Sequence, residues 1–252
     1  MAKENNISAE SFWQQAWPIM QRVMETQMEA IRQAAQLFAE SIEQDGLVRS
    51  YGTGHSRVFA MELVDRAGGL VPVTRMDMED LAVRGKWALD VVKDPVIERN
   101  LEASQQLLSC YKIDPQDVFV IASQSGVNVA TVEVAQRVKS WGHKLVVVTA
   151  LEQSKRVPSR HPSGKKLYEL GDIVIDNCGP FGDALLELPG GGKVCSVSSL
   201  TGSLIAQALT AETIKILLEH GKRPPVLISD NIPGGIENNQ ELRDKYAGRI
   251  HI

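Results

Sequence analysis

The sequence predicts a three-layer α/β protein, in which helices cover both faces of a parallel sheet and a further helix precedes the sheet. Short apolar runs alternate with helical segments along the chain, which is typical of strands joined by helical crossovers. A long amphipathic segment comes before the first of these runs. The 43% hydrophobic and 23% charged content is that of an ordinary globular domain.

The first element is a helix predicted over residues 9–45, because apolar side chains recur at alternating steps of four and three from Met24 to Ile42. Gly46 is predicted to end it as the glycine that follows a helix. We expect residues 1–45 to form this helical extension and residues 46–252 to form the main domain with its C-terminal tail. The apolar stripe should pack on that domain or on a partner subunit.

Five apolar runs follow as the predicted strands. They are LVRSY (47–51), LVPV (70–73), VFVIA (118–122), LVVVT (145–149) and DIVID (172–176). Helices are expected at 128–141 and 200–220, and in a charged stretch over 76–111 that breaks at Asp94-Pro95. The polar tail lacks the apolar faces of an independent core, so it should lie over the domain or a neighbouring subunit.

Composition excludes several classes of function. The net charge of −4 over 252 residues gives no basic face for nucleic acid. The N-terminus lacks the pattern of a secretory signal, and no apolar run approaches the roughly 20 residues of a membrane span. The three cysteines are widely spaced and form no metal-binding pattern. We therefore expect a cytoplasmic protein with buried thiols, no bound metal, and neither nucleic acid nor membrane as a partner.

Two strand ends carry the chemistry expected of an anion site. The first run leads into GTGHS, where Gly52 and Gly54 permit close backbone approach and Thr53, His55 and Ser56 offer donors. The third leads into SQSGVN, which offers Ser123, Ser125 and Asn128 around Gly126. Neither stretch fits a nucleotide-binding pattern. Any one of these serines taken alone is more typical of a helix N-cap. Two hydroxyl-rich glycine loops at the ends of apolar strands together favour an anion site, and hydroxyls with backbone amides around a glycine suit a single terminal phosphate.

SQSG followed by Asn128, preceded by GTGHS and followed by DIVID, resembles the sugar isomerase (SIS) domain family over roughly residues 30–220. Segments such as ELVDRAGGLVPV and PPVLIS make the chain most similar to its small stand-alone bacterial members. The resemblance implies a five-stranded parallel sheet of the doubly wound, flavodoxin-like kind. It also implies a homodimer or homotetramer with sites near subunit interfaces, a sugar phosphate or similarly anionic sugar as ligand, and no organic cofactor.

Carried over by position, the resemblance assigns Ser56, Ser123, Ser125 and Asn128 to the phosphate, with Gln124 beside it. The predicted phosphate and sugar site also includes Gly54, from the glycine loop, and Thr201, near the start of the last helix.

Three residues are candidate catalysts, because moving a proton between adjacent sugar carbons requires a base and a group that opens the ring. Glu62 stands in the apolar context FAMELV six residues after Ser56, and its alternative role is an ion pair with Arg66. His55 sits at a helix start, and His161 lies in the proline-bracketed segment PSRHP. Glu212 is a weaker alternative base, and Glu79 and Asp80 could reach the sugar or simply form a charged helix start.

The sequence thus predicts a phosphosugar aldose–ketose isomerase that works through an enediolate. Two alternatives stay open: a lyase or etherase that uses the same proton abstraction, and a non-catalytic regulatory protein that binds sugar phosphate.

Overall fold

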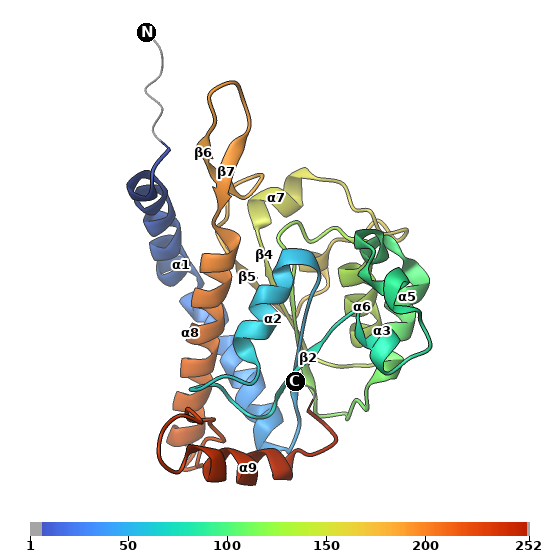
Figure 1. Cartoon of the computed structure of the whole chain (residues 1–252), viewed down its shortest axis with the longest axis vertical. Coiled ribbons are helices and arrows are strands. Elements are labelled where there is room, and N and C mark those ends of the chain that lie inside the picture. Colours follow the sequence, from blue (N-terminus) through green and yellow to red (C-terminus); the bar gives the residue numbers. More distant parts are fainter. Residues whose placement is uncertain (1–6, 251–252) are drawn as a thin grey trace.

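A parallel sheet of five strands forms the centre of the molecule, with helices on both faces (Figure 1). The computed structural model describes residues 7–250. The strands run in the order β2-β1-β3-β4-β5 and pair in parallel throughout. Their bounds are β1 Val48–Gly52, β2 Val73–Met76, β3 Val118–Ala122, β4 Leu145–Thr149 and β5 Ile173–Asp176. This arrangement confirms the predicted fold. The direction in which successive strands are added to the sheet changes between β1 and β3, and ligands bind at such a switch point in open α/β sheets.

The second strand begins three residues later than predicted. The run expected over 70–73 is partly used elsewhere, because Leu70 forms a bridge with Val226 and the Val71 N–H donates to the carbonyl of Pro225. Pairing with β1 starts at Val73. Pro72 has no N–H to give to a ladder, so the strand forms after it rather than through it.

Helices divide between the two faces of the sheet. On one face, α1 Ala9–Glu43, α2 Arg57–Leu63 and α8 Ser198–Glu219 pack side by side. Phe38 of α1, Phe59 of α2 and Ile205 of α8 share one apolar cluster with Val120 of β3. On the other face lie α3 Asp80–Val83, α5 Leu101–Leu107 and α6 Val129–Ser140, and Val134 of α6 packs there with neighbouring apolar side chains. Burying apolar side chains on both faces explains why the central strands read as continuous apolar runs.

The charged stretch over 76–111 is a chain of short helical pieces rather than a long helix. After α3 come α4 Leu89–Lys93, the 3₁₀ turn η2 Pro95–Arg99, α5 and the turn η3 Leu108–Cys110. The predicted break at Asp94-Pro95 is confirmed, since the Asp94 carboxylate accepts from the Val96 N–H at 2.8 Å and starts η2.

The first helix ends at Glu43, slightly before the predicted boundary. The residue with left-handed backbone is Asp45 (φ 58°), so Gly46 is not the left-handed cap that the sequence predicts. Gly46 is needed for space instead: a Cβ there would lie 2.5 Å from Ser41 Oγ and 2.7 Å from the Gln116 carbonyl oxygen.

The chain after β4 adds elements that periodicity did not predict. They are α7 Leu151–Arg156, the turn η4 Leu167–Glu169, the hairpin strands β6 Ala184–Glu187 and β7 Lys193–Ser196, and α9 Gly235–Lys245. The hairpin packs on the N-terminal part of α1 (Figure 1). The tail lies over the domain as expected, because Leu227 and Tyr246 pack against Leu47 and Val71.

Candidate functional site

The loop after β1 is shaped by two glycines. A Cβ at Gly52 would lie 2.4 Å from the carbonyl oxygen of Ser56, so only glycine lets the chain turn this tightly. Gly54 has a left-handed φ of 54° and opens the 3₁₀ turn η1 Gly54–Ser56, which leads directly into α2. The turn exposes His55 and leaves Ser56 half-buried at the carboxyl end of the strand.

The loop after β3 is held by a hydrogen bond between one of its side chains and its own backbone. Ser123 Oγ accepts a hydrogen bond from the Gly126 N–H at 3.1 Å. Gly126 has a φ of 63°, and a Cβ there would lie 2.8 Å from Ser154 Oγ and 3.0 Å from Thr149 Oγ1. Since Gly52 and Ala122 are paired neighbours in the sheet, the two loops lie beside each other.

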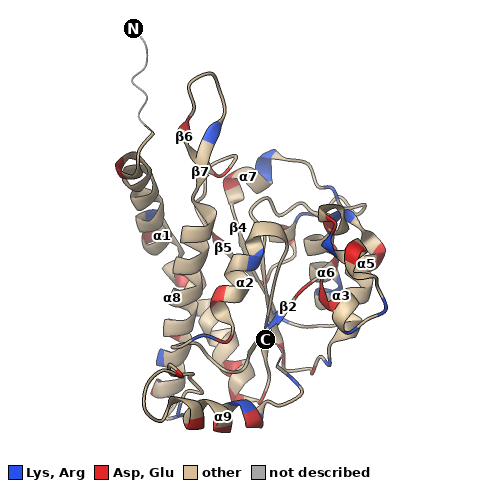
Figure 2. Cartoon of the chain, viewed as in Figure 1, with Lys and Arg blue, Asp and Glu red and all other residues tan. Residues whose placement is uncertain are grey.

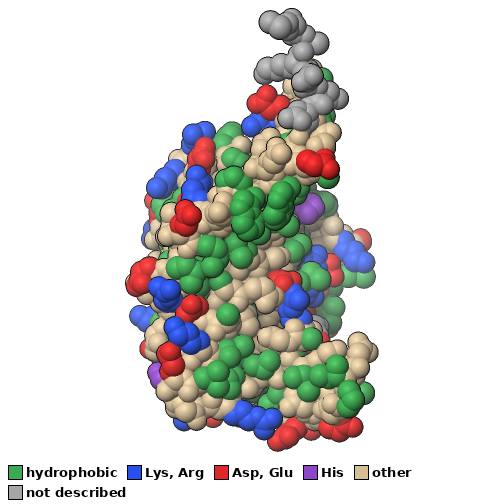
Figure 3. Space-filling view, turned by 90° about the vertical axis from the view of Figure 1, so that its left-hand side faces the viewer, with side chains coloured by type: hydrophobic (Ala, Val, Ile, Leu, Met, Phe, Trp, Pro, Cys, Tyr) green, Lys and Arg blue, Asp and Glu red, His purple; other side chains and the backbone are tan. Residues whose placement is uncertain are grey.

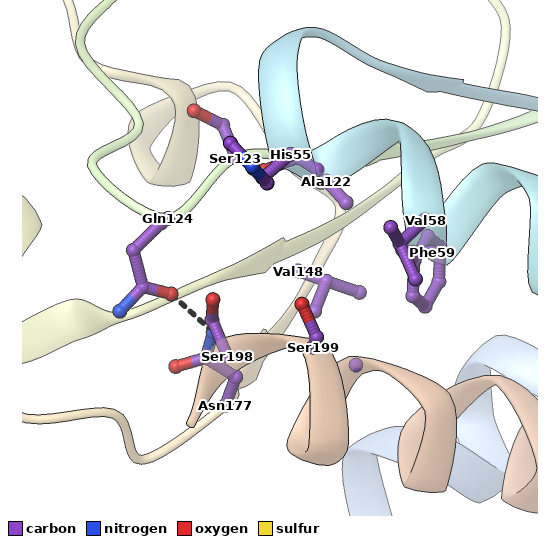
Figure 4. A pocket seen from close by; sticks show the side chains of 12 residues that line it. His55, Val58, Phe59, Ala122, Ser123, Gln124, Val148, Asn177, Ser198 and Ser199 are labelled. Atoms are coloured by element: carbon purple, nitrogen blue, oxygen red, sulfur yellow. Dashed lines mark hydrogen bonds between the residues drawn. The ribbon is translucent and has the colours of Figure 1, made fainter. Parts of the chain in front are cut away.

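One pocket is shared by both loops (Figure 4). The loops contribute His55, Ser56, Ser123 and Gln124, four of the predicted site residues. Three further polar residues complete the lining: Asn177 after β5, and Ser198 and Ser199 at the start of α8. The remaining wall includes Val58, Phe59, Ala122 and Val148. The pocket therefore offers hydroxyls, amides and one imidazole against an apolar floor.

The start of α8 faces this pocket. The Asp183 carboxylate caps the helix, accepting from the Ser198 N–H at 2.9 Å and from Ser198 Oγ at 2.6 Å. No charged residue lies within α8 before Glu212 (Figure 2), but the Asp183 carboxylate already offsets part of the positive end of this 22-residue helix dipole.

The predicted residue of this helix, Thr201, does not line the pocket. It is fully buried, and its hydroxyl donates to the Ser198 carbonyl at 3.2 Å. The hydroxyls of α8 that line the pocket are those of Ser198 and Ser199, because the helix begins at Ser198, two residues before the predicted start.

An amide pair joins two sides of the pocket. Asn177 Nδ2 donates to Gln124 Oε1 at 2.6 Å (Figure 4). Asn177 Oδ1 accepts from the Gly179 N–H at 2.9 Å. Asn177 directly follows the fifth predicted strand. The rule that ligands meet the carboxyl ends of such strands could have found it.

Asn128 and Gly54 belong to a second group of contacts. Asn128 Nδ2 donates to Glu98 Oε2 at 2.9 Å, and Asn128 Oδ1 accepts from Arg160 Nη1 at 3.0 Å. Gly54 lies against the same glutamate, since a Cβ there would be 2.9 Å from Glu98 Oε1. Ser125 is half-buried and lines neither the shared pocket nor the cavity beside Gly54 that is described next.

A second cavity of about 240 Å³ lies beside Gly54, at the ends of β1 and β2. Arg57 pairs there with Asp77 Oδ2 at 2.8 Å and donates to Glu79 Oε1 at 3.2 Å. Burial raises the pKa of Asp77 against the opposing hydrogen bond from Glu79 N–H and the charge of Arg57. Glu98 lines the same cavity.

Glu62 is held outside both cavities. Its Oε1 accepts from Arg66 Nη1 and, at 2.6 Å, from Gln207 Nε2. The ion pair with Arg66 that the sequence offered as an alternative role is therefore present, and it is extended by an amide from α8. Glu212 lies near Arg32 and Lys215 at 3.9 and 3.8 Å.

His161 is buried in contacts of its own loop and α6. Its Nδ1 lies 3.1 Å from the Ser163 N–H, which can only donate, so Nδ1 is the acceptor and Nε2 carries the proton. Nε2 then donates to Glu133 Oε2 at 3.0 Å. This bond ties the segment to α6, and His161 does not line the shared pocket.

The matching family model is that of the SIS domain, over residues 11–150. The chain belongs to the SIS domain family, as its sheet order and its pair of strand-end loops indicate. It is 41% identical over 244 residues to UPF0309 protein lmo0025 of Listeria monocytogenes, covering 95% of this chain and 97% of that relative.

Solved structures share the fold at low sequence identity. The phosphoheptose isomerase of Francisella tularensis matches with a TM-score of 0.55 at 15% identity, and phosphoheptose isomerase GmhA of Neisseria gonorrhoeae with 0.54 at 16%. Each match covers 82% of this chain and 96% of the other chain. Among the helices of residues 7–250, none is long and apolar enough to cross a membrane.

Proposed function

We propose that this chain binds a sugar phosphate in the pocket shared by the two strand-end loops and interconverts its aldose and ketose forms. The observation that carries the proposal is the convergence of Ser56 and Ser123 on one pocket at the sheet's switch point, opposite the start of α8. Hydroxyls and backbone amides together bind a dianion without a bulky cation. The phosphoheptose isomerases with the same fold support the choice of substrate class.

The proposed chemistry is proton transfer between neighbouring carbons through an enediolate. His55 is the one of the three predicted catalysts that lines the pocket. We assign it the proton transfers, because a histidine can both take and return a proton near neutral pH. Asn177 lines the same pocket, and the second N–H of its amide, beside the one given to Gln124 Oε1, is the donor that we assign to a developing enediolate oxygen.

A second candidate function is binding without turnover. The observation that favours it is the position of Glu62, whose carboxylate is bound by Arg66 and Gln207 away from the pocket. A regulatory protein needs the anion site but no base. Elimination of a sugar substituent, as in a lyase or etherase, needs the same catalytic base as isomerisation. A protein without that base would catalyse neither reaction.

A thermal-shift screen against sugar phosphates, followed by NMR of each hit in deuterated water, tests the proposal. Isomerisation gives the second isomer with solvent deuterium at the carbon next to the carbonyl, whereas elimination gives an unsaturated product. A hit that stays unchanged over hours supports the regulatory function. Ser123→Ala should lose the thermal shift, while Ser140→Ala, which removes an exposed hydroxyl at the end of α6, should keep it. Equal shifts for both variants would refute the proposed site.

We also propose that a second copy of the chain covers the face formed by α1 and α8. Figure 3 shows hydrophobic side chains gathered on this side of the molecule. Trp13 is 53% exposed and Trp17 45% exposed, with ring centroids 5.2 Å apart. Exposed aromatic groups of this kind mark association surfaces. Light scattering should give a dimer or tetramer for the wild type and a monomer for the double variant Trp13→Glu/Trp17→Glu; an unchanged mass would remove this face from the assembly.

A further inference from the structure

The pocket residue Asn177 belongs to a turn with unusual backbone geometry. Cys178, which follows it, has a left-handed φ of 58°, a conformation that residues with a side chain rarely adopt. Asn177 itself is 5% exposed, and its side chain bridges the Gly179 N–H and Gln124 Oε1. Contacts from outside the turn must therefore hold it, because the place of the Asn177 amide in the pocket depends on this backbone.

The long helix α1 holds the backbone on one side of Asn177. Strand β5 lies at an edge of the sheet, so its outward N–H groups have no neighbouring strand to accept them. The Asn177 N–H faces inward and donates to the Thr149 carbonyl of β4 at 3.0 Å. The Asp176 N–H donates instead to Gln27 Oε1 of α1 at 2.9 Å. Gln27 thus supplies the acceptor that a further strand would supply.

The same helix holds the backbone on the other side of Asn177. Arg22 Nη2 donates to the carbonyl of the left-handed residue, Cys178, at 2.7 Å. Thr26, one helical turn further along α1, places its Oγ1 3.9 Å from Cys178 Sγ. Side chains of α1 therefore contact the residues immediately before and after Asn177, although they do not line the pocket themselves.

We propose that Arg22 and Gln27 are positioning residues, which fix the Asn177 amide in the pocket by holding the backbone on both sides of it. This inference rests on the proposed function, in which Asn177 donates to the enediolate oxygen. A donor that is aimed in advance stabilises a developing charge without having to reorganise, and a misplaced donor loses much of that effect. Without the two side chains, the turn after β5 should relax and move the amide away from the ligand. Ser56 and Ser123 belong to other loops and should keep their places.

The test compares variants of α1 in the full chain. Gln27→Met and Arg22→Met keep an unbranched side chain but remove its strong hydrogen bonds. Gln33→Met is the matched control, because Gln33 is exposed on the same helix and donates to Glu29 Oε1 of α1 itself at 2.9 Å. Arg22→Lys keeps a donor and serves as the rescue.

Calorimetric titration with inorganic phosphate and with a short series of phosphorylated sugar hydroxamates separates the two parts of the site. A planar hydroxamate imitates the enediolate, so an aimed donor should make it bind more tightly than phosphate. In Gln27→Met and Arg22→Met the Kd for phosphate should change by less than about twofold. The Kd for the tightest hydroxamate should rise about tenfold, the level expected for a hydrogen bond to a charged group. Arg22→Lys should recover most of this loss, and Gln33→Met should show none of it.

The Cys178 thiol gives a second measurement, which needs no ligand. It is 4% exposed and burial raises its pKa, so in a background of Cys110→Ala and Cys195→Ala it should react slowly with iodoacetamide. The two methionine variants at the contacts should react about fivefold faster than the control variant, because the turn opens more often. Losing the Arg22 charge alone would raise the thiol pKa further and slow the reaction, so a faster reaction reports a looser backbone.

The inference is overturned if Gln27→Met and Arg22→Met react with iodoacetamide no faster than Gln33→Met, or if the hydroxamate keeps its full advantage over phosphate in both. Equal losses of phosphate and hydroxamate binding would also overturn it, since the α1 contacts would then support the whole pocket rather than Asn177. The proposed function fails differently. A wild-type chain that binds neither phosphate nor hydroxamate refutes the site, and one that binds both equally refutes the assigned role of Asn177.

A wild-type preference for the hydroxamate that survives in both variants leaves the proposed function standing and refutes the positioning role alone.

Discussion

Gly126→Ala is expected to damage both stability and the phosphate loop. The native φ of 63° lies in the left-handed region, which costs a residue with a side chain about 1–2 kcal/mol. The new Cβ would also lie 2.8 Å from Ser154 Oγ and 3.0 Å from Thr149 Oγ1. Relieving such crowding in a packed interior typically costs about 1–3 kcal/mol more.

The chain contains a matched control for the backbone part of this cost. Gly142 follows α6 with a φ of 86°, and a Cβ there would meet nothing within 4 Å. Gly142→Ala should therefore lose only about 1–2 kcal/mol, whereas Gly126→Ala should lose about 2–5 kcal/mol. For a chain of this size each kcal/mol lowers Tm by about 2–4 °C.

Thermal and urea unfolding of the two variants give the comparison, and phosphate titration gives the functional consequence. The Gly126 N–H holds Ser123 Oγ, so moving this residue should also weaken phosphate binding, while Gly142→Ala should bind normally. Equal destabilisation of the two variants would show that the loop is not crowded and would refute the packing described for it.

Two further predictions concern polar groups in the interior. Asp117→Ala should destabilise the chain by about 3–5 kcal/mol in urea unfolding, because it leaves the fully buried Arg49 guanidinium without its carboxylate at 2.6 Å; a loss below about 1 kcal/mol would contradict this. Burial would raise the pKa of Glu133, but hydrogen bonds from Arg137 and His161 outweigh it and lower the pKa. Its contribution to stability should therefore be complete above the ordinary glutamate pKa of about 4.3 and disappear as the pH falls through the lower folded-state pKa. In Glu133→Gln, the free energy of unfolding should fall less steeply with decreasing pH in that window than it does in the wild type. An unchanged pH profile would contradict the stabilising role of the Glu133 hydrogen bonds with Arg137 and His161.

The fold was predictable because its strands are buried on both faces. A run such as VFVIA leaves little choice of structure, and the glycine-rich loops after β1 and β3 are local features that stand next to such runs in the chain. Pro72 shows the limit of this reasoning: the apolar run around it was visible, but its pairing with the C-terminal tail depends on contacts more than 150 residues away in sequence.

The candidate site was predictable where it is local and hidden where it is assembled from distant segments. His55, Ser56, Ser123 and Gln124 follow directly from the loops. By contrast, the meeting of Glu98 with Asn128 depends on how a chain of short helical pieces folds back over the sheet. A sequence contains no periodic signal for such a contact.

The hairpin β6–β7 separates a remote tip from a fixed base. Asp183, at its base, binds the first turn of α8 through two hydrogen bonds. The three glycines at 190–192 have positive φ angles, and a Cβ added to any of them would meet nothing within 4 Å. Extra residues can therefore be inserted at the tip of the hairpin without moving α8, the helix that borders the pocket. A fluorophore or affinity tag placed there would report on the protein while leaving its ligand chemistry undisturbed.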